Sequence, residues 1–142
     1  MSANISAMTT SSGPRAIVAA HGQFAAGLVS AVACIAGAAA AARLVPLSNA
    51  TLGAAELAEA LRRAVESSGA RVVFTDLPAG SCTIAARRVA RDIPGLTVVC
   101  GANLPLLLTF AVASPGATVA LREAVDKART AMLVVGEGRR VD

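Results

Sequence analysis

The chain has 142 residues, a net charge of +4 and 55% hydrophobic residues. The length is that of one domain with its own core, and the apolar fraction excludes an intrinsically disordered chain. Three Phe and no Trp or Tyr are present, which excludes the aromatic platforms that stack single-stranded nucleic acids. The arginines are scattered in short groups, and we interpret them as solvated faces. The alternative, an RNA-binding domain, predicts salt-dependent binding without a role for the single histidine.

The three cysteines are an odd number without a CxxC pair. This pattern indicates neither a disulfide framework nor a zinc centre, and one histidine does not make a cluster of metal ligands. Free thiols fit a reducing cytosol. The sequence therefore predicts a cytoplasmic protein without a metal or another cofactor.

Two N-terminal segments differ from the rest of the chain. Residues 1–13 are small and polar and predict a flexible tail ahead of a single domain over 14–142. Residues 24–42 carry no charge, and about 20 apolar residues are long enough to cross a bilayer. Because this segment is mostly Ala and Gly, it would insert weakly, and we expect no membrane insertion. The alternative, a membrane-attached or exported protein, predicts membrane fractionation.

Four short apolar runs recur along the chain, with starts 27, 28 and 25 residues apart. Continuous runs of this kind, rich in β-branched residues, are typical of strands that a parallel sheet buries on both faces. The sequence therefore predicts strands at 16–20, 43–47, 71–75 and 96–100.

Between and after these runs, apolar residues follow the spacing of helices. Gly69 ends the first clear stripe and Pro94 ends the second. Cys82 lies on the second stripe, which predicts a buried side chain. The predicted helices are 54–65, 82–93, 104–113 and 121–132.

Alternating strands and helices predict an α/β fold with an open, mostly parallel sheet and helices on both faces. The common small version has the strand order 2-1-3-4. Residues 133–141 predict a fifth short strand, paired either within the chain or with a partner chain. Strands 1 and 3 are neighbours in this order, and ligands collect in the crevice at their carboxyl ends.

Two residues whose side chains could take part in catalysis lie at this crevice. His21 follows strand 1 at once, and Asp76 follows strand 3 at once. A carboxylate that accepts from one ring N–H leaves the other imidazole nitrogen free as a nucleophile. The alternative is that His21 is a polar loop residue and Asp76 caps a helix. The paired position at two strand ends favours the functional interpretation.

The loop after Asp76 leads into a helix. Gly80 lets the backbone come close to a ligand, and Ser81 is a natural N-cap. The free N–H groups of a helix N-terminus suit an anion such as a phosphoryl group held against His21. A plainly capped helix explains this loop equally well.

Three other types of site that occur at this crevice do not fit the sequence. Strand 1 is followed by HGQFAAG rather than GxGxxG, as a dinucleotide site requires. Lys127 is the only lysine, so there is no GK[ST] of a P-loop. A response-regulator receiver would need acids after strand 1 and a lysine near the last strand. His21 remains the candidate nucleophile.

The segments AIVAAHGQFAAGL, VVFTDLPAGSCTIAARRV and VVCGANLPLLL resemble the mannose/fructose-family enzyme IIA of the bacterial sugar phosphotransferase system. The resemblance covers about residues 14–135. It rests on HG after strand 1, D…GS after strand 3 and GxNxP after strand 4. The sequence departs from the family at Ala79 and Cys82, where members often carry Gly and Pro.

The resemblance implies roles for individual residues. His21 matches the histidine that takes a phosphoryl group from phospho-HPr and passes it to a sugar-specific IIB component. Asp76 matches the carboxylate that orients it, and Ser81 matches a serine near the phosphoryl group. The family is a homodimer that exchanges its C-terminal strand, here 133–141. The residues expected to bind the phosphoryl group or form the rim are Gly22, Gly80, Thr83, Gly101 and Asn103.

The expected function is therefore a phosphotransferase that carries a phosphoryl group on His21 during sugar uptake. One alternative is a regulatory or interaction protein of the same fold, phosphorylated on His21 without feeding a transporter. Another is the phosphoryl-donor subunit of a dihydroxyacetone kinase system.

Overall fold

The computed structural model describes residues 13–113, 119–136 and 138. Four parallel strands form one sheet in the order β2-β1-β3-β4. The predicted α/β fold and strand order are therefore confirmed. The predicted tail, residues 1–13, lies outside the described residues except for Gly13. The strands are β1 (Ala16–Ala20), β2 (Leu44–Ser48), β3 (Val72–Thr75) and β4 (Thr97–Cys100).

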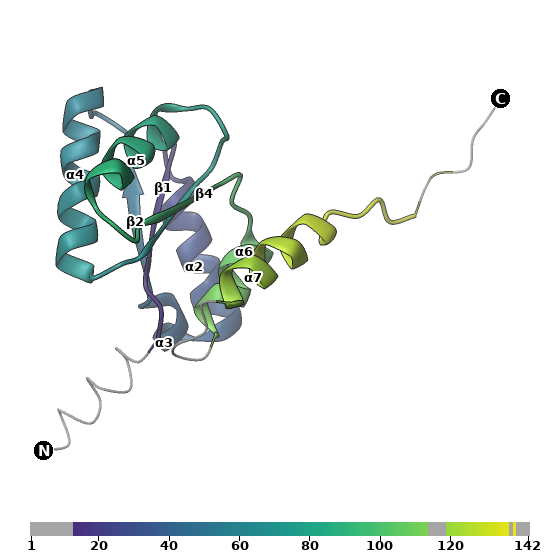
Figure 1. Cartoon of the computed structure of the whole chain (residues 1–142). Helices are drawn as coiled ribbons and strands as arrows, with labels where there is room; N and C mark the ends of the chain where they lie inside the picture. The colour runs from purple at the N-terminus through teal and green to yellow at the C-terminus, as the bar shows by residue number, and fades with distance from the viewer. Residues whose placement is uncertain (1–12, 114–118, 137, 139–142) are drawn as a thin grey trace, which may run out of the picture.

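Helices cover both faces of the sheet (Figure 1). The uncharged segment 24–42 does not form one continuous helix, because Gly37 with φ of 95° interrupts it. In the part of the chain that the structure describes, no helix has the length and apolarity to cross a membrane. One face carries α4 (Ala54–Ser68) and α5 (Ser81–Asp92), and the other carries α2 (Phe24–Ala36), α3 (Ala38–Ala41), α6 (Leu104–Ala111) and α7 (Val119–Thr130).

The alternation of side chains along the strands divides the core into two halves. In β1, Val18 belongs to the half beneath α2, α6 and α7, whereas Ile17 belongs to the half beneath α4 and α5. In β3, Phe74 belongs to the first of these halves and Val73 to the second. Because β1 and β3 are central strands buried on both faces, their carboxyl ends are held firmly in place.

Asn103 is a structural residue of this fold. Its side-chain oxygen accepts from the N–H of Leu106 at 3.0 Å and caps α6. Its amide donates to the carbonyl of Ala128 at 3.2 Å and ties α6 to α7.

We expect Asn103→Ala to lower the free energy of unfolding by about 1–2 kcal/mol, because it removes a helix cap and a tie between two helices. Urea unfolding followed by circular dichroism measures the change. Asn103→Asp is the matched variant, since it keeps the capping oxygen and loses only the donor. A loss just as large in Asn103→Asp would mean that the cap contributes nothing.

The C-terminal segment differs from the expectation. Helix α7 ends at Thr130, and Met132, expected on its buried stripe, is 85% exposed. The described residues beyond it form no strand, and the segment extends away from the domain (Figure 1). Much of the predicted strand 133–141 lies outside the described residues. Leu133, Val134 and Val135 are also largely exposed, because none of the described residues covers them.

Candidate active site

The carboxyl ends of β1, β2 and β3 bring three loops together. The register aligns Ala19 with Thr75, and Ala20 with Ser48. The residues that follow these strand ends therefore meet at the carboxyl end of the sheet. His21 comes from the first loop and Asp76 from the third, as the topology predicts.

His21 and Asp76 form a direct pair. His21 Nδ1 lies 2.8 Å from Asp76 Oδ2, and the same oxygen accepts from the backbone N–H of His21 at 2.9 Å. An ionised carboxylate only accepts, so Nδ1 carries the proton and Nε2 keeps its lone pair. The His21 side chain is 46% exposed and the Asp76 side chain 12%. In this tautomer the pair therefore presents a ring nitrogen with a lone pair that a partner can reach.

The environment keeps Asp76 ionised. Burial would raise the pKa of this carboxyl, but the hydrogen bonds from the backbone N–H and the ring of His21 outweigh burial and lower the pKa below its ordinary value. Asp76 is therefore a permanent negative partner for His21 at neutral pH.

The N-terminus of α5 lies beside this pair. Gly80, not Ser81, is the N-cap, and no side chain caps the helix. The helix begins at Ser81, one residue earlier than expected, because Gly80 adopts the extended backbone of the cap. The N–H groups of a first helical turn have no partner within the helix. They and the helix dipole favour an anion next to His21.

Gly80 leaves space beside the imidazole. A Cβ added at Gly80 would lie 3.4 Å from His21 Cε1. Any residue can adopt the φ of −165° that Gly80 has. Glycine is therefore favoured at this position for its small size and not for its backbone conformation. A single methyl group fits at this separation, and a branched side chain would push the ring aside.

For the phosphorylation of His21 that the resemblance implies, we expect Gly80→Val to slow the reaction by roughly tenfold to a hundredfold, because the displaced ring loses its alignment. Initial rates of labelling measure the effect, with thermal unfolding as a check on the fold. Gly80→Ala is the matched control and should remain near the wild-type rate. Equal rates for Gly80→Val and wild type would contradict this use of the space.

Asn49 is a residue of the site that the sequence analysis missed. It follows β2 by one residue, the same signal that identified His21 and Asp76. Its Oδ1 accepts from the N–H of Gly22 at 3.3 Å, and its Nδ2 donates to Ser81 Oγ at 3.4 Å. Asn49 therefore connects the loop of His21 to the start of α5. Gly22, with φ of 56°, makes the turn after His21.

Thr83 does not lie on the rim, where it was expected. It is buried, and its hydroxyl contacts Thr75 Oγ1 at 2.6 Å and donates to the carbonyl of Leu77. The rotation of α5 that buries Cys82 also turns Thr83 inward. Thr83 therefore holds the loop between β3 and α5 in place from the buried side of that loop.

A comparison with protein families identifies the chain. The family model described as the fructose IIA component of the PTS, the sugar phosphotransferase system, matches residues 15–129. The chain belongs to this family. The resemblance to the mannose/fructose-family enzyme IIA is thereby confirmed. Family members are phosphotransferases in general, and membership gives this chain a IIA-type role in sugar transport by a phosphotransferase system.

Solved structures share the fold of this IIA protein. The mannose/sorbose-specific IIA subunit of Enterococcus faecalis is 22% identical with a TM-score of 0.77, over 91% of this chain and 99% of that chain. A PTS IIA protein associated with the fucose utilization operon of Streptococcus pneumoniae is 22% identical with a TM-score of 0.76, over 87% and 93%. A sigma-54 interaction domain protein from Enterococcus faecalis is 14% identical with a TM-score of 0.68, over 85% and 94%. None of the curated proteins matches the sequence.

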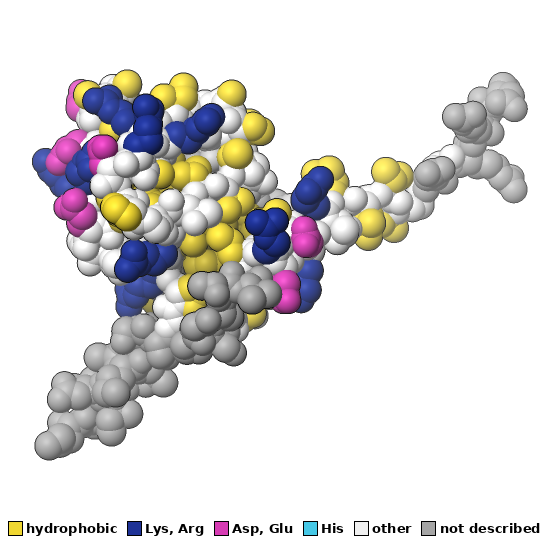
Figure 2. Space-filling model, in the orientation of Figure 1, with side chains coloured by type: hydrophobic (Ala, Val, Ile, Leu, Met, Phe, Trp, Pro, Cys, Tyr) yellow, Lys and Arg dark blue, Asp and Glu magenta, His cyan; other side chains and the backbone are white. Residues whose placement is uncertain are grey.

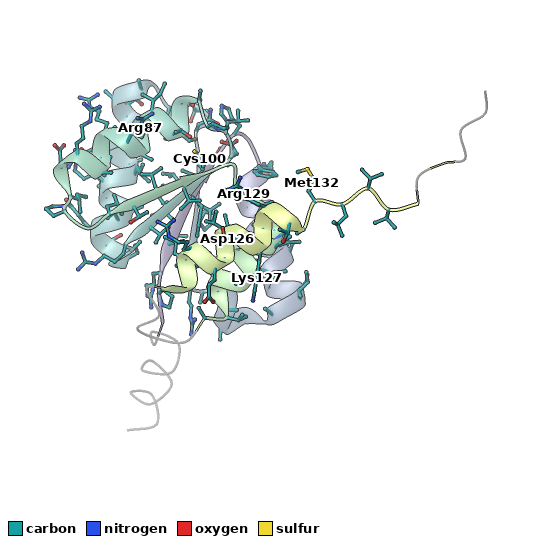
Figure 3. The ribbon with its side chains drawn as sticks, turned by 45° about the vertical axis from the view of Figure 1, so that its right-hand side comes forward. Arg87, Cys100, Asp126, Lys127, Arg129 and Met132 are labelled. Carbon is teal, nitrogen blue, oxygen red and sulfur yellow. The ribbon has the colours of Figure 1, made fainter. Side chains whose placement is uncertain are left out.

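Gly101 and Asn103 belong to a neighbouring hollow of the IIA protein rather than to the surroundings of the imidazole. They line a space of about 530 Å³ between β4, α6 and α7. Cys100, Arg129 and Met132 line the same hollow and lie around it in Figure 3. His21 is not among its lining residues. The loop after β4 therefore borders a second surface next to the candidate active site.

Proposed function

We propose that this IIA protein is a cytoplasmic phosphocarrier that accepts a phosphoryl group on His21 from phospho-HPr and passes it to a sugar-specific IIB component. The observation that carries the proposal is the 2.8 Å contact between His21 Nδ1 and Asp76 Oδ2. It leaves Nε2 as a free nucleophile on a half-exposed ring. Family membership supports partners of this kind in general.

In the proposed transfer, the lone pair of His21 Nε2 attacks the phosphorus in line. The bond between phosphorus and the donor breaks, and its electron pair leaves with the donor. Positive charge develops on the imidazole, and Asp76 stabilises it through Nδ1–H. The N–H groups at Gly80 and Ser81, with the Ser81 hydroxyl, stabilise the phosphoryl oxygens. Transfer to the IIB component runs through the same steps in reverse.

The decisive experiment is a phosphotransfer assay with labelled phosphoenolpyruvate, enzyme I and HPr. We expect acid-labile, base-stable label on the wild-type chain and none on His21→Ala. His21 is exposed enough for its loss to leave the fold intact, which circular dichroism checks. Absence of label on the folded wild-type chain, with HPr of the same organism, would contradict the phosphocarrier function.

The same assay separates the regulatory alternative. The similarity of fold to a sigma-54 interaction domain protein makes a regulatory protein a second candidate with the same histidine chemistry. A carrier passes its label to a IIB component at a rate that matches sugar uptake. A regulatory protein keeps its label until a different partner removes it.

We also propose that the functional unit is a homodimer formed through the C-terminal segment. β4 is an edge strand of the sheet, and a strand edge is a template for pairing with another strand. Apolar and polar residues line hollows of about 530 and 480 Å³ along β4 and α7, on the face seen in Figure 2. The exposed apolar residues Met132 to Val135 of a second copy have the length and chemistry to cover this surface.

A further inference from the structure

A third side chain with ligand chemistry lies at the His21–Asp76 pair. Cys82 is the second residue of α5 and lies in its first turn, next to the loop that follows Asp76. One ring nitrogen of His21, one carboxylate oxygen of Asp76 and Cys82 Sγ lie within 4.8 Å of one another. The three residues come from the ends of β1 and β3 and from the start of α5. No motif in the sequence reveals the cluster, because its members are 55 and 6 residues apart.

Nitrogen, oxygen and sulfur in this combination are the ligands that Zn²⁺ prefers. Around a tetrahedral Zn²⁺ with bonds of about 2.0–2.3 Å, ligand atoms lie roughly 3.3–3.8 Å apart. The three ligand atoms lie within 4.8 Å of one another, which is close to that spacing. Hard cations such as Mg²⁺ and Ca²⁺ are disfavoured, because they take oxygen ligands rather than a thiolate.

The carboxylate itself provides an independent observation. Asp76 Oδ1 is buried and has no hydrogen-bond partner among the described residues. A buried acceptor without a partner is costly, and a cation bound next to it would satisfy it. Cys82 is fully buried and closes the site from the core, whereas the half-exposed His21 leaves it open to solvent. The arrangement matches three protein ligands with a fourth position for water.

We propose that His21, Asp76 and Cys82 form a binding site for Zn²⁺ at the active site. Binding replaces the thiol proton of Cys82 by a metal–sulfur bond and releases that proton to solvent. Zn²⁺ bound at Nδ1 displaces the proton of that nitrogen, which passes through solvent to Nε2 and occupies the lone pair needed for phosphorylation; the metal thereby replaces the hydrogen bond from Nδ1 to Asp76. Zinc occupancy and phosphorylation of His21 therefore exclude each other, a consequence that rests on the proposed function.

Cobalt is the probe for this site, because a thiolate bound to Co²⁺ absorbs in the near ultraviolet whereas Zn²⁺ is spectroscopically silent. The purified full-length chain, freed of metal with a chelator, is titrated with Co²⁺. We expect one equivalent to produce the thiolate band and Zn²⁺ to abolish it by displacement. The double variant Cys34→Ser/Cys100→Ser should keep the band, since those two thiols are exposed and outside the cluster. Cys82→Ser should lose it.

His21→Ala provides a second test that does not depend on the fold tolerating a change in the core. It should weaken Co²⁺ binding roughly tenfold to a hundredfold, since one ligand is lost. No band in wild type, a band that persists in Cys82→Ser, or unchanged affinity in His21→Ala would overturn the proposal. The titration uses no phosphoryl donor, so its failure leaves the phosphocarrier function untouched. Conversely, a chain that is never phosphorylated can still pass this test.

Discussion

Asp76→Asn should reduce the rate of His21 phosphorylation by about two to four orders of magnitude. The carboxylate accepts from both the ring and the backbone of His21. An amide at this position offers an N–H₂ group to Nδ1, which favours the tautomer with its proton on Nε2 and removes the nucleophile. It also removes the negative charge that stabilises the developing imidazolium.

Single-turnover labelling from phospho-HPr measures this loss, and nitrogen NMR of the histidine ring reports the tautomer directly. Asp92→Asn is the matched control. Asp92 is 59% exposed and pairs with Arg62 at 2.8 Å, on the far end of α5 from His21. We expect its rate to stay within about twofold of wild type, because an exposed ion pair contributes little. A rate for Asp76→Asn equal to that of Asp92→Asn would show that the carboxylate does not serve the transfer.

Charged substitutions in the C-terminal segment should convert the proposed homodimer into a monomer. Leu133 and Val135 are 72% and 85% exposed in the single chain, and apolar side chains stand out along this segment in Figure 2. Burying them against β4 of a partner would supply the free energy of association. Lysine at both positions removes that gain and places charges on an apolar surface.

Size-exclusion chromatography with light scattering measures the mass. We expect twice the chain mass of 14.1 kDa for wild type and the single-chain mass for Leu133→Lys/Val135→Lys. Ile35→Lys is the control, because Ile35 is 64% exposed on α2, outside the C-terminal segment. A dimer that survives the double substitution would place the interface elsewhere, and a monomeric wild-type chain would remove the dimer from the proposed function.

Local signals in the sequence were sufficient to predict the architecture and the pairing of His21 with Asp76. Continuous apolar runs with regular spacing predict parallel strands, because such strands are buried on both faces. Right-handed connections then leave few strand orders. His21 and Asp76 each follow a strand directly, so the order 2-1-3-4 predicts that they lie close together, as the 2.8 Å contact shows.

The details around the pair depend on how the helices are rotated and where the backbone turns. Ser81 was expected as the cap, yet the extended backbone of Gly80 takes that position. Thr83 was expected on the rim, yet it lies inside with its hydroxyl bonded to Leu77 and Thr75. Asn49 follows β2, outside the two neighbouring strand ends that predict the pair, and only the packed structure shows its amide reaching across to Ser81.

The sequence by itself determined the α/β fold and the pairing of His21 with Asp76, because both depend on periodicity and on residues adjacent to strand ends. The family followed from the resemblance of the motifs at these strand ends. Only the tertiary structure decided that Cys82 Sγ lies within 4.8 Å of ligand atoms of that pair and that Asp76 Oδ1 has no hydrogen-bond partner among the described residues. Such contacts join residues from separate elements, and packing, not local sequence, sets their distances. The exposure of Met132 likewise follows from where α7 ends and from the absence of anything in this chain's described residues to cover it.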